Sequence, residues 1–414
     1  MEAAENRLRG IPWRALEGLA PALDGPLAEV LAGAPAERVL DRFLRSRRDL
    51  ASEARAAVAE AVFGVGLWRR RLRWHAGHGA SPRLLLAALL RDLGGEPAAE
   101  AVAGLPPGSL PPARAGPRAL ADRWSLPDWL AEVLAREAGE RAGDLAAALA
   151  LPGPICLRVN RLRTDRAALA ARLRGEGLPT SPGRLAPACL VALSRRPNLL
   201  GLPAFREGLF EVQDEASQLV AALVGARPGE SVLDACAGAG GKSLALAADV
   251  GPGGRVHATD PDPERLARLR TRARRAGAAR IATVHGAEPA ADLRVDRALV
   301  DAPCSELGAL RRGPDLRWRI DPASFAALPA LQRSILAGAA GHVRLGGRLV
   351  YATCTFRREE DEEVALAFEQ DHPGWRRLRP EADPALVTGE GFLRTWPHRD
   401  GADGFFAATW ERNL

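Results

Sequence analysis

Lysine and tyrosine are almost absent from this sequence. Lys242 is the only lysine and Tyr351 the only tyrosine among 414 residues, and arginine supplies the other basic side chains. The general use of arginine indicates that most positions tolerate its wide planar guanidinium. A compact ammonium fits a crowded pocket that a guanidinium cannot enter. The retained Lys242 therefore predicts a site that requires an ammonium group.

The sequence also lacks the marks of membrane, secreted and metal-binding proteins. No apolar run approaches the roughly 20 residues of a membrane helix, and the first ten residues, MEAAENRLRG, lack the apolar core of a secretory signal. The five cysteines and seven histidines show neither a disulfide framework nor the spacing of a metal site. We expect a cytoplasmic monomer with no metal and no membrane partner.

Length and charge set the outer bounds. A chain of 414 residues is too long for one compact core and predicts two or three domains. The formal net charge of +6 favours a polyanionic partner such as RNA. A general preference for arginine gives the same basic balance without any such partner, so charge alone leaves both interpretations open.

The first predicted domain is helical. Up to about Gly104, the segments ERVLDRFL, ARAAVAEAVFGVGLW and SPRLLLAALLRDL carry apolar residues at helical spacing. The segment that follows, LPPGSLPPARAGP at 105–117, cannot hold a regular helix, because proline removes a hydrogen-bond donor and clashes with the preceding turn. We place a linker there, so that the first domain comprises residues 1–117.

A basic and aromatic cluster lies within this helical domain. The segment LWRRRLRWHAGH places four arginines between two tryptophans, namely Arg69, Arg70, Arg71 and Arg73 between Trp68 and Trp74. Such a cluster can bind RNA through phosphate contacts and base stacking. A solvated helix face above tryptophans of the core is an equally good interpretation.

Two further domains are expected. Residues 118–204 predict a small α+β module, with a helix running towards Leu149, strands at ICLRVN and CLVAL, and a helix over 165–174. From residue 205 to 414, strands alternate with helices, which is typical of an α/β fold with a mostly parallel, doubly wound sheet. Ligands of such sheets bind beyond the carboxyl ends of the strands.

The stretch LDACAGAGGKS, from Leu233 to Ser243, is the most informative part of the chain. A buried strand ends at Asp234, a loop rich in glycine follows, and a helix begins again by Leu244. Glycine lets the backbone turn sharply and approach a ligand, with the first N–H groups of the helix facing it. A plain turn from strand to helix is the alternative, so this signal needs support from later strands.

Later strands end in residues that can supply this support. Asp260 ends the second strand, where a carboxylate can bind both hydroxyls of a ribose or simply cap the next helix. Asp301 and Cys304 follow the strand DRALV, and Cys354 follows RLVYAT. In a doubly wound sheet these two strands should neighbour the first, so that all three loops converge on one cleft. A lone cysteine is more often a small apolar filler. Two cysteines at corresponding strand ends favour catalysis, because a thiolate can add to an electron-poor ring carbon.

Five motifs in this order resemble the RsmB/Sun family of RNA cytosine-C5 methyltransferases. They are EVQDEASQ, LDACAGAGGKS, DAPCSELGALRRGPDLRW, YATCT and DGADGFFAA. The resemblance covers the last half of the chain, and the helical front is similar in pattern to the NusB-like domain of some bacterial rRNA methyltransferases. It implies a class I (Rossmann-like) methyltransferase fold, S-adenosylmethionine as cofactor and RNA as partner. The resemblance favours small-subunit (16S) rRNA, but a tRNA or a large-subunit site would use the same catalytic residues.

The resemblance also implies roles for individual residues. Cys354 would be the nucleophile that adds to C6 of cytosine, Cys304 would assist release of the methylated base, and Asp301 would lie beside cofactor and cytosine. Lys242 would face the target base. The residues implied to contact the cofactor are Cys236, Ala237, Gly238, Ala239, Gly240, Gly241, Lys242, Asp260 and Asp301.

Several positions depart from the family pattern. Ala239 stands where the family commonly has a proline that stiffens the loop, which predicts weaker cofactor binding. Ala287 stands where an aspartate usually contacts the adenine side of the cofactor, with Glu288 one residue late. Glu306 and Leu307 in DAPCSELG, and Thr355 after Cys354, also differ but look compatible with the fold.

Parts of the sequence are compatible with two other functions. GAGGKS is similar to the end of a phosphate-binding P-loop, but the glycine that this motif needs five residues before Gly241 is replaced by Cys236. The spacing therefore makes a P-loop-like NTPase the less favoured alternative. A non-catalytic RNA-binding factor with a decayed methyltransferase domain stays open, because the aspartate is missing at position 287.

Overall fold

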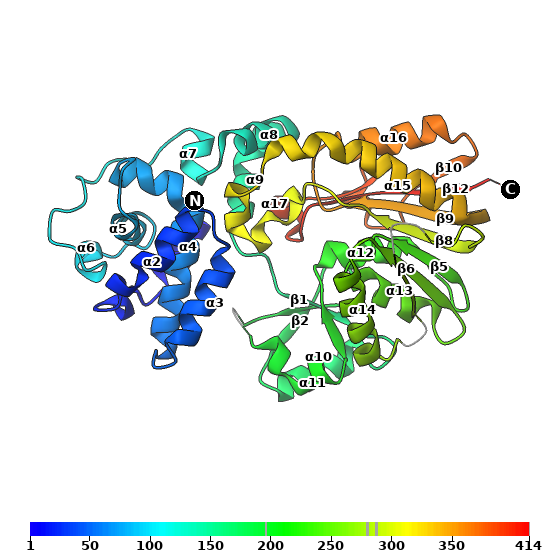
Figure 1. Ribbon diagram of the computed structural model, residues 1–414, viewed down its shortest axis with the longest axis horizontal. Helices are drawn as coiled ribbons and strands as arrows, with labels where there is room; N and C mark the ends of the chain where they lie inside the picture. Colours follow the sequence, from blue (N-terminus) through cyan, green and yellow to red (C-terminus); the bar gives the residue numbers. More distant parts are fainter. Residues whose placement is uncertain (195–196, 279–280, 286–288, 414) are drawn as a thin grey trace. The chain divides into compact units, whose positions relative to one another are not determined.

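The structure is a computed structural model that describes residues 1–194, 197–278, 281–285 and 289–413. These residues pack into two compact units (Figure 1). Unit 1 comprises Met1–Pro152 and Leu310–Pro322, and unit 2 comprises Gly153–Ala309 and Ala323–Leu414. This division into two units is coarser than the three expected domains, whose boundaries stay a prediction.

Unit 1 is entirely helical in its described residues. Apolar side chains at helical spacing bury one face of each long helix, and α4 is buried along most of its length. The helices are α1 (Glu2–Arg9), α2 (Asp24–Leu31), α3 (Ala36–Ser46), α4 (Ser52–Ala76), α5 (Pro82–Asp92), α6 (Ala99–Val102), α7 (Leu120–Trp124), α8 (Asp128–Ala138) and α9 (Ala142–Leu149). Short 3₁₀ helices lie at Trp13–Leu16, Ala20–Leu23, Gly139–Arg141 and Pro314–Trp318.

The arginines of the basic and aromatic cluster make contacts inside unit 1. Arg71 is buried and pairs with Asp92 at 2.6 Å, Arg70 pairs with Asp122 at 2.5 Å, and Arg69 lies 4.0 Å from the ring centroid of Trp318. An open phosphate-binding face needs exposed cations. These contacts favour a packing role for the cluster over the RNA-binding interpretation.

A small antiparallel sheet begins unit 2. Its strands are ordered β2-β3-β1-β4, with β1 (Cys156–Val159) at its centre and β4 (Phe210–Val212) at one edge. The other strands are β2 (Thr180–Pro182) and β3 (Cys189–Ala192). Two helices, α10 (Arg166–Gly175) and α11 (Pro203–Arg206), pack on this sheet around a core that includes Leu157 and Phe210.

The larger sheet of unit 2 has the order β10-β12-β9-β8-β5-β6-β7, and β11 pairs with β12. Strands β5 to β9 are parallel to one another, and β12 runs antiparallel to β9. The strands are β5 (Ser231–Ala235), β6 (Arg255–Asp260), β7 (Ile281–His285), β8 (Val295–Asp301), β9 (Val343–Thr353), β10 (Trp375–Leu378), β11 (Leu393–Thr395) and β12 (Phe405–Arg412). This is the predicted α/β fold with a mostly parallel sheet, extended by antiparallel strands that the sequence patterns did not indicate.

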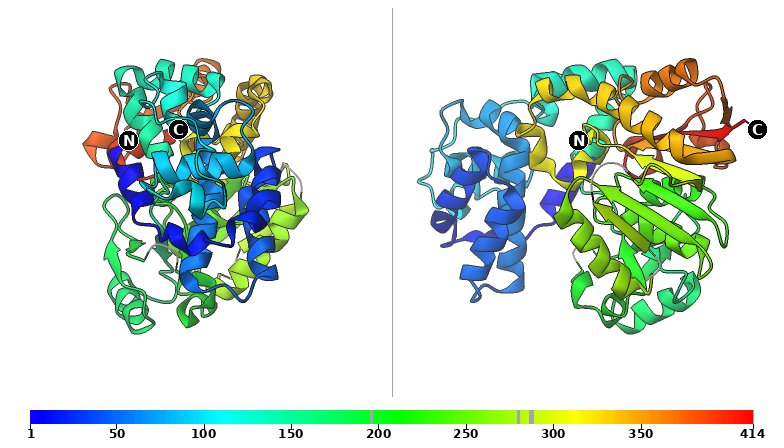
Figure 2. Two further views of the ribbon diagram at one scale, coloured as in Figure 1. Left: turned by 90° about the vertical axis from the view of Figure 1, so that its left-hand side faces the viewer. Right: turned by 45° about the vertical axis from the view of Figure 1, so that its right-hand side comes forward.

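Helices cover both faces of the larger sheet (Figure 2). Val232 of β5 packs with α12 to α14, and the next residue, Leu233, packs with α15 and α16. Successive side chains of a strand point to opposite faces, so burial on both faces requires a continuous apolar run. The helices are α12 (Glu215–Leu223), α13 (Gly241–Val250), α14 (Pro263–Ala276), α15 (Leu328–His342), α16 (Glu362–Asp371) and α17 (Pro397–Asp400).

Across the described residues, no helix combines the length and the apolar character needed to cross a bilayer. In the same residues, no group of three or more histidine, cysteine, aspartate or glutamate side chains could hold a metal ion.

Gly208 permits close packing between the small sheet and α14. Its φ is +72°, and a Cβ atom there would lie 2.1 Å from the backbone oxygen of Arg275. We expect Gly208→Ala to lower the free energy of unfolding by about 2 kcal/mol or more, since a left-handed backbone costs about 1–2 kcal/mol without glycine and the clash adds to it. Urea denaturation measures the loss.

Gly229→Ala is the matched control for this prediction. Gly229 also has a positive φ, of +88°, but a Cβ atom there would meet nothing within 4 Å. The free energy of unfolding of this variant should fall only by the cost of the left-handed backbone, about 1–2 kcal/mol. Equal losses for the two variants would contradict the assignment of a packing role to Gly208.

Candidate active site

Four neighbouring strands bring the predicted site residues to one edge of the larger sheet. The strands β6, β5, β8 and β9 lie side by side in that order, and all four are parallel. Asp260 ends β6, the glycine loop (residues 236–241) follows β5, and the two cysteines follow β8 and β9. The expected convergence of these loops is therefore observed, although β9 neighbours β8 and not β5.

The glycine loop is built on backbone contacts with β6. The backbone N–H groups of Cys236 and Ala237 donate to the backbone oxygen of Thr259 at 3.0 and 2.8 Å. The Gly238 N–H donates to the side-chain oxygen Oδ2 of Asp260 at 2.9 Å. Cys236 adopts a φ of +84°, a region in which residues other than glycine are uncommon. A Cβ atom at Gly238 would meet nothing within 4 Å, so the loop is open on that side.

Lys242 lies buried at the start of α13. Its Nζ is 2.6 Å from Asp301 Oδ2 and 5.1 Å from the ring centroid of Phe405. Lys242 is 7% exposed, whereas Asp301 is half-buried and open to the site. The ammonium is thus enclosed between a carboxylate and an aromatic face, the kind of narrow space that the single lysine predicts.

The two cysteine sulfurs are in contact. Cys304 Sγ and Cys354 Sγ lie 3.5 Å apart, and both side chains are only partly buried. The hydrogen bond with Cys354, followed by burial, raises the pKa of the Cys304 thiol well above its usual range. A raised pKa keeps the proton on Cys304, so this thiol can donate to the sulfur of Cys354.

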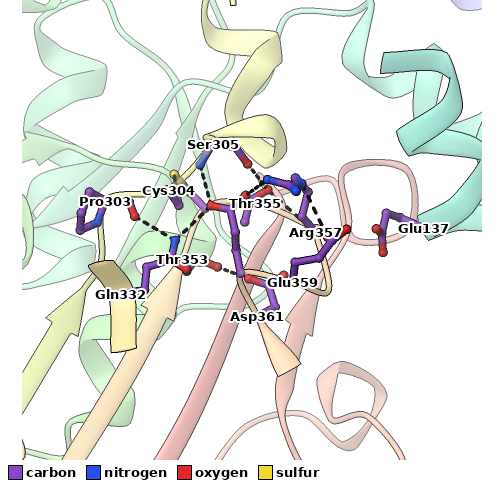
Figure 3. A network of polar contacts seen from close by, with 12 residues as sticks. Glu137, Pro303, Cys304, Ser305, Gln332, Thr353, Thr355, Arg357, Glu359 and Asp361 are labelled. Carbon is purple, nitrogen blue, oxygen red and sulfur yellow. Dashed lines mark hydrogen bonds and ion pairs between the residues drawn. The ribbon is translucent and has the colours of Figure 1, made fainter. Parts of the chain in front are cut away.

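A buried carboxylate ties the two cysteine loops together. Glu360 Oε2 accepts from the Ser305 N–H at 2.9 Å and from Gln332 Nε2 at 3.0 Å. Gln332 Nε2 also donates to the Pro303 oxygen at 2.9 Å, and Ser305 Oγ lies 2.8 Å from Thr355 Oγ1. Figure 3 shows these side chains gathered around Cys304. The residues on both sides of Cys304 are therefore fixed to the loop that carries Cys354.

Sequence reasoning missed Glu360, Gln332 and Phe405. Glu360 belongs to the acidic run REEDEE, which is typical of a solvated surface, yet it is completely buried. Gln332 lies on α15, for which no motif was identified. Glu306, which was expected to be compatible with the fold, adopts a left-handed φ of +57°. Ala287 and Glu288, the adenine-side positions, lie outside the described residues.

Asp234 is completely buried beneath the glycine loop. Its Oδ2 accepts from Ser243 Oγ at 2.5 Å, whereas Oδ1 has no hydrogen-bond partner among the described residues. Burial raises the pKa of this carboxyl from 3.8 to about 7; the Ser243 hydrogen bond opposes the shift and the nearby Asp301 adds to it. Asp234 therefore titrates near neutral pH.

The raised pKa of Asp234 predicts a pH-dependent stability. The folded state favours the protonated carboxyl, so its stabilising effect is complete below about pH 4 and is lost as the pH rises through about 7. In Asp234→Asn the side chain is neutral throughout. The stability of the natural protein relative to this variant should fall between pH 4 and 7, by up to about 4 kcal/mol if each pKa unit contributes about 1.4 kcal/mol. Urea denaturation of both proteins across this pH range measures the difference in the free energy of unfolding. If this difference is the same at every pH, the assignment of a raised pKa to Asp234 is wrong.

Comparisons with known proteins agree with this geometry. A family model for the 16S rRNA methyltransferase RsmB/F matches residues 221–411, and a model for the RsmF/B-like ferredoxin-like domain matches residues 126–197. The chain is 37% identical over 305 residues to a probable ribosomal RNA small subunit methyltransferase B of Synechocystis, covering 71% of this chain and 68% of the relative. The corresponding Bacillus subtilis protein is 36% identical over 308 residues, with coverage of 71% and 68%.

A solved structure shows the same fold. NSun6 from Pyrococcus horikoshii with SFG superimposes with a TM-score of 0.63 at 21% sequence identity, covering 70% of this chain and 98% of that chain. At this identity the likeness concerns the fold, and the relatives in sequence carry the family assignment. The chain belongs to the RsmB/F family of methyltransferases.

Proposed function

We propose that this protein methylates C5 of a cytosine in RNA with S-adenosylmethionine as cofactor. The observation that carries the proposal is the contact between the sulfurs of Cys304 and Cys354, 3.5 Å apart at the end of two neighbouring strands. The names of the relatives, ribosomal RNA small subunit methyltransferase B, favour small-subunit rRNA as the substrate.

The residues around the glycine loop fit such a cofactor. The loop is open at Gly238, and the first N–H groups of α13 can receive a carboxylate at the positive end of the helix. Each carboxylate oxygen of Asp260 accepts one hydrogen bond from a backbone N–H: Oδ2 from Gly238 and Oδ1 from Asp262. A carboxylate has about four acceptor sites, so Asp260 can still accept from two ribose hydroxyls.

Cys354 is proposed to activate the base. C5 of cytosine is too weak a nucleophile to take a methyl group unaided, so the Cys354 thiolate adds at C6 and leaves C5 electron-rich. The bound cofactor supplies the methyl group as an electrophile on its sulfonium. Loss of the C5 proton then returns the electron pair to the ring and expels the Cys354 thiolate. The base has to be unstacked to reach this sulfur.

Cys304 is proposed to act after the methyl transfer. Before the reaction, the hydrogen bond with Cys354 holds the proton on Cys304. Once Cys354 is bonded to carbon it carries no charge, so the largest cause of the raised Cys304 pKa is removed and burial remains. Cys304 can then pass its proton to water and, as a thiolate, take the C5 proton, which allows the base to be released.

The two cysteines should give opposite phenotypes on substitution. Cys354→Ala should abolish methylation without any adduct, because no nucleophile remains. Cys304→Ala should accumulate RNA bound to protein, because the adduct forms but is released slowly. The measurement incubates each variant with S-adenosylmethionine and radiolabelled rRNA and follows the label in denaturing electrophoresis. Cys189→Ala, a substitution of a buried cysteine in the small sheet, is the control and should show neither effect.

The reversed result would change the assignment. An adduct in Cys354→Ala but not in Cys304→Ala would make Cys304 the nucleophile. Loss of activity in Cys304→Ala with no adduct would give Cys304 a structural role only.

The position of the product tests the reaction itself. Deletion of the gene should remove one or more 5-methylcytosines from rRNA, and bisulfite sequencing of rRNA and tRNA from the deletion strain locates them. Reintroduction of the natural gene should restore the signal, and Cys354→Ala should not. An unchanged pattern of 5-methylcytosine in both RNA classes would contradict the proposed activity.

A further inference from the structure

Two carbonyl oxygens of the glycine loop accept hydrogen bonds from arginines outside it. Arg272 of α14 donates from Nη1 to the Ala239 oxygen at 2.8 Å. Arg158 of β1 donates from Nη1 to the Gly241 oxygen. Burial lowers the pKa of Arg158 to about 10, so it remains charged at neutral pH. The second half of the glycine loop is thus held by two charge-assisted hydrogen bonds.

The small sheet orients both arginines. Glu211 of β4 is buried and accepts from Arg272 Nη2 at 3.0 Å and from Nε at 3.2 Å. Glu211 is also the direct cross-strand neighbour of Arg158, and the next residue but one, Gln213, accepts from Arg158 Nη1. The β1 and β4 pair therefore supplies one of the two arginines, Arg158, and the carboxylate that orients the other.

The loop needs such support because it has little of its own. Gly238 and Gly240 adopt φ values of +55° and +85°, and within the loop the Gly240 N–H donates to the Ala237 oxygen at 2.9 Å. Ala239 replaces the proline that would otherwise restrict the backbone. Arg158 adds a hydrogen bond to the Gly241 oxygen, at the first residue of α13.

We infer that Arg158 and Arg272 are positioning residues for the cofactor, which makes the small sheet a structural part of the cofactor site. The inference rests on the proposed function, because it takes the glycine loop to bind S-adenosylmethionine. In this arrangement the two arginines stiffen from outside a loop that lacks its internal proline. Among the described residues, neither arginine makes a hydrogen bond with Cys304 or Cys354.

The first test measures cofactor affinity. Arg272→Met and Arg158→Met should each weaken binding of S-adenosylhomocysteine, measured by calorimetry on the full chain, by about tenfold or more, since a hydrogen bond from a charged group is worth about 1.5–3 kcal/mol. The KM for S-adenosylmethionine should rise while kcat at saturation stays near that of the natural protein. Arg272 is only half-buried, so its variant tests the loop even if Arg158→Met does not fold.

Arg275→Met is the matched control. Arg275 lies on the same helix as Arg272 and pairs with the same Glu211, but it makes no hydrogen bond to the glycine loop among the described residues. It should therefore lose an ion pair without losing cofactor affinity. Equal weakening in Arg275→Met and Arg272→Met would assign the effect to general packing and overturn the inference.

A rescue experiment tests the mechanism of support. Ala239 has a negative φ, since the described non-glycine residues with positive φ are Ser125, Cys236 and Glu306. Its N–H donates none of the hydrogen bonds of the described residues, so a proline there removes no hydrogen bond. Ala239→Pro should restore most of the affinity lost in Arg272→Met. Failure of this rescue would contradict the proposed stiffening.

The outcomes separate the two proposals. If the natural protein binds S-adenosylhomocysteine and both arginine variants bind it equally well, the inference is wrong and the proposed function stands. If the natural protein does not bind S-adenosylhomocysteine at all, the proposed function fails and the inference fails with it.

Discussion

The register between β8 and β9 is the constraint on which the candidate site depends. These strands are parallel, and Asp301 pairs with Ala352. Cys304 lies three residues beyond Asp301 and Cys354 two residues beyond Ala352, so both sulfurs emerge at the same height of the sheet. A slip of one residue would turn each side chain of β9 to the opposite face. The sulfur contact therefore follows from this register.

The single lysine and the single tyrosine have different explanations. Lys242 is enclosed by Asp301 and Phe405, and an arginine would need room for a planar fork at this place. Tyr351 is fully buried, and its hydroxyl donates a hydrogen bond to the backbone oxygen of Glu360 at 2.5 Å. This position therefore requires a large apolar ring that carries a hydrogen-bond donor at its far end, which explains the tyrosine. Tyr351 takes no part in the proposed chemistry.

The sequence predicted the parallel strands and the residues at their ends, because alternation and motif spacing are local properties. It did not predict how those residues are supported. Arg158 lies more than 80 residues before the loop that it holds, and Glu360 lies 55 residues after Ser305. No periodic pattern links such partners. The left-handed φ of Glu306 was equally hidden, since that conformation is uncommon outside glycine.

Electrostatics distinguish the three cysteines near the site. Burial, together with Asp234, Asp301 and Asp260, raises the pKa of Cys236 to about 12. This cysteine therefore stays a thiol although it lies in the glycine loop. The Cys304 pKa is raised first by its hydrogen bond with Cys354, then by burial, and less by Glu360. Burial and fixed carboxylates thus hold the proton on Cys236, whereas for Cys304 the largest contribution comes from Cys354 and its charge, and burial comes second. In the proposed reaction that charge disappears when the adduct forms, which ties the second cysteine's ionisation to completion of the first cysteine's attack.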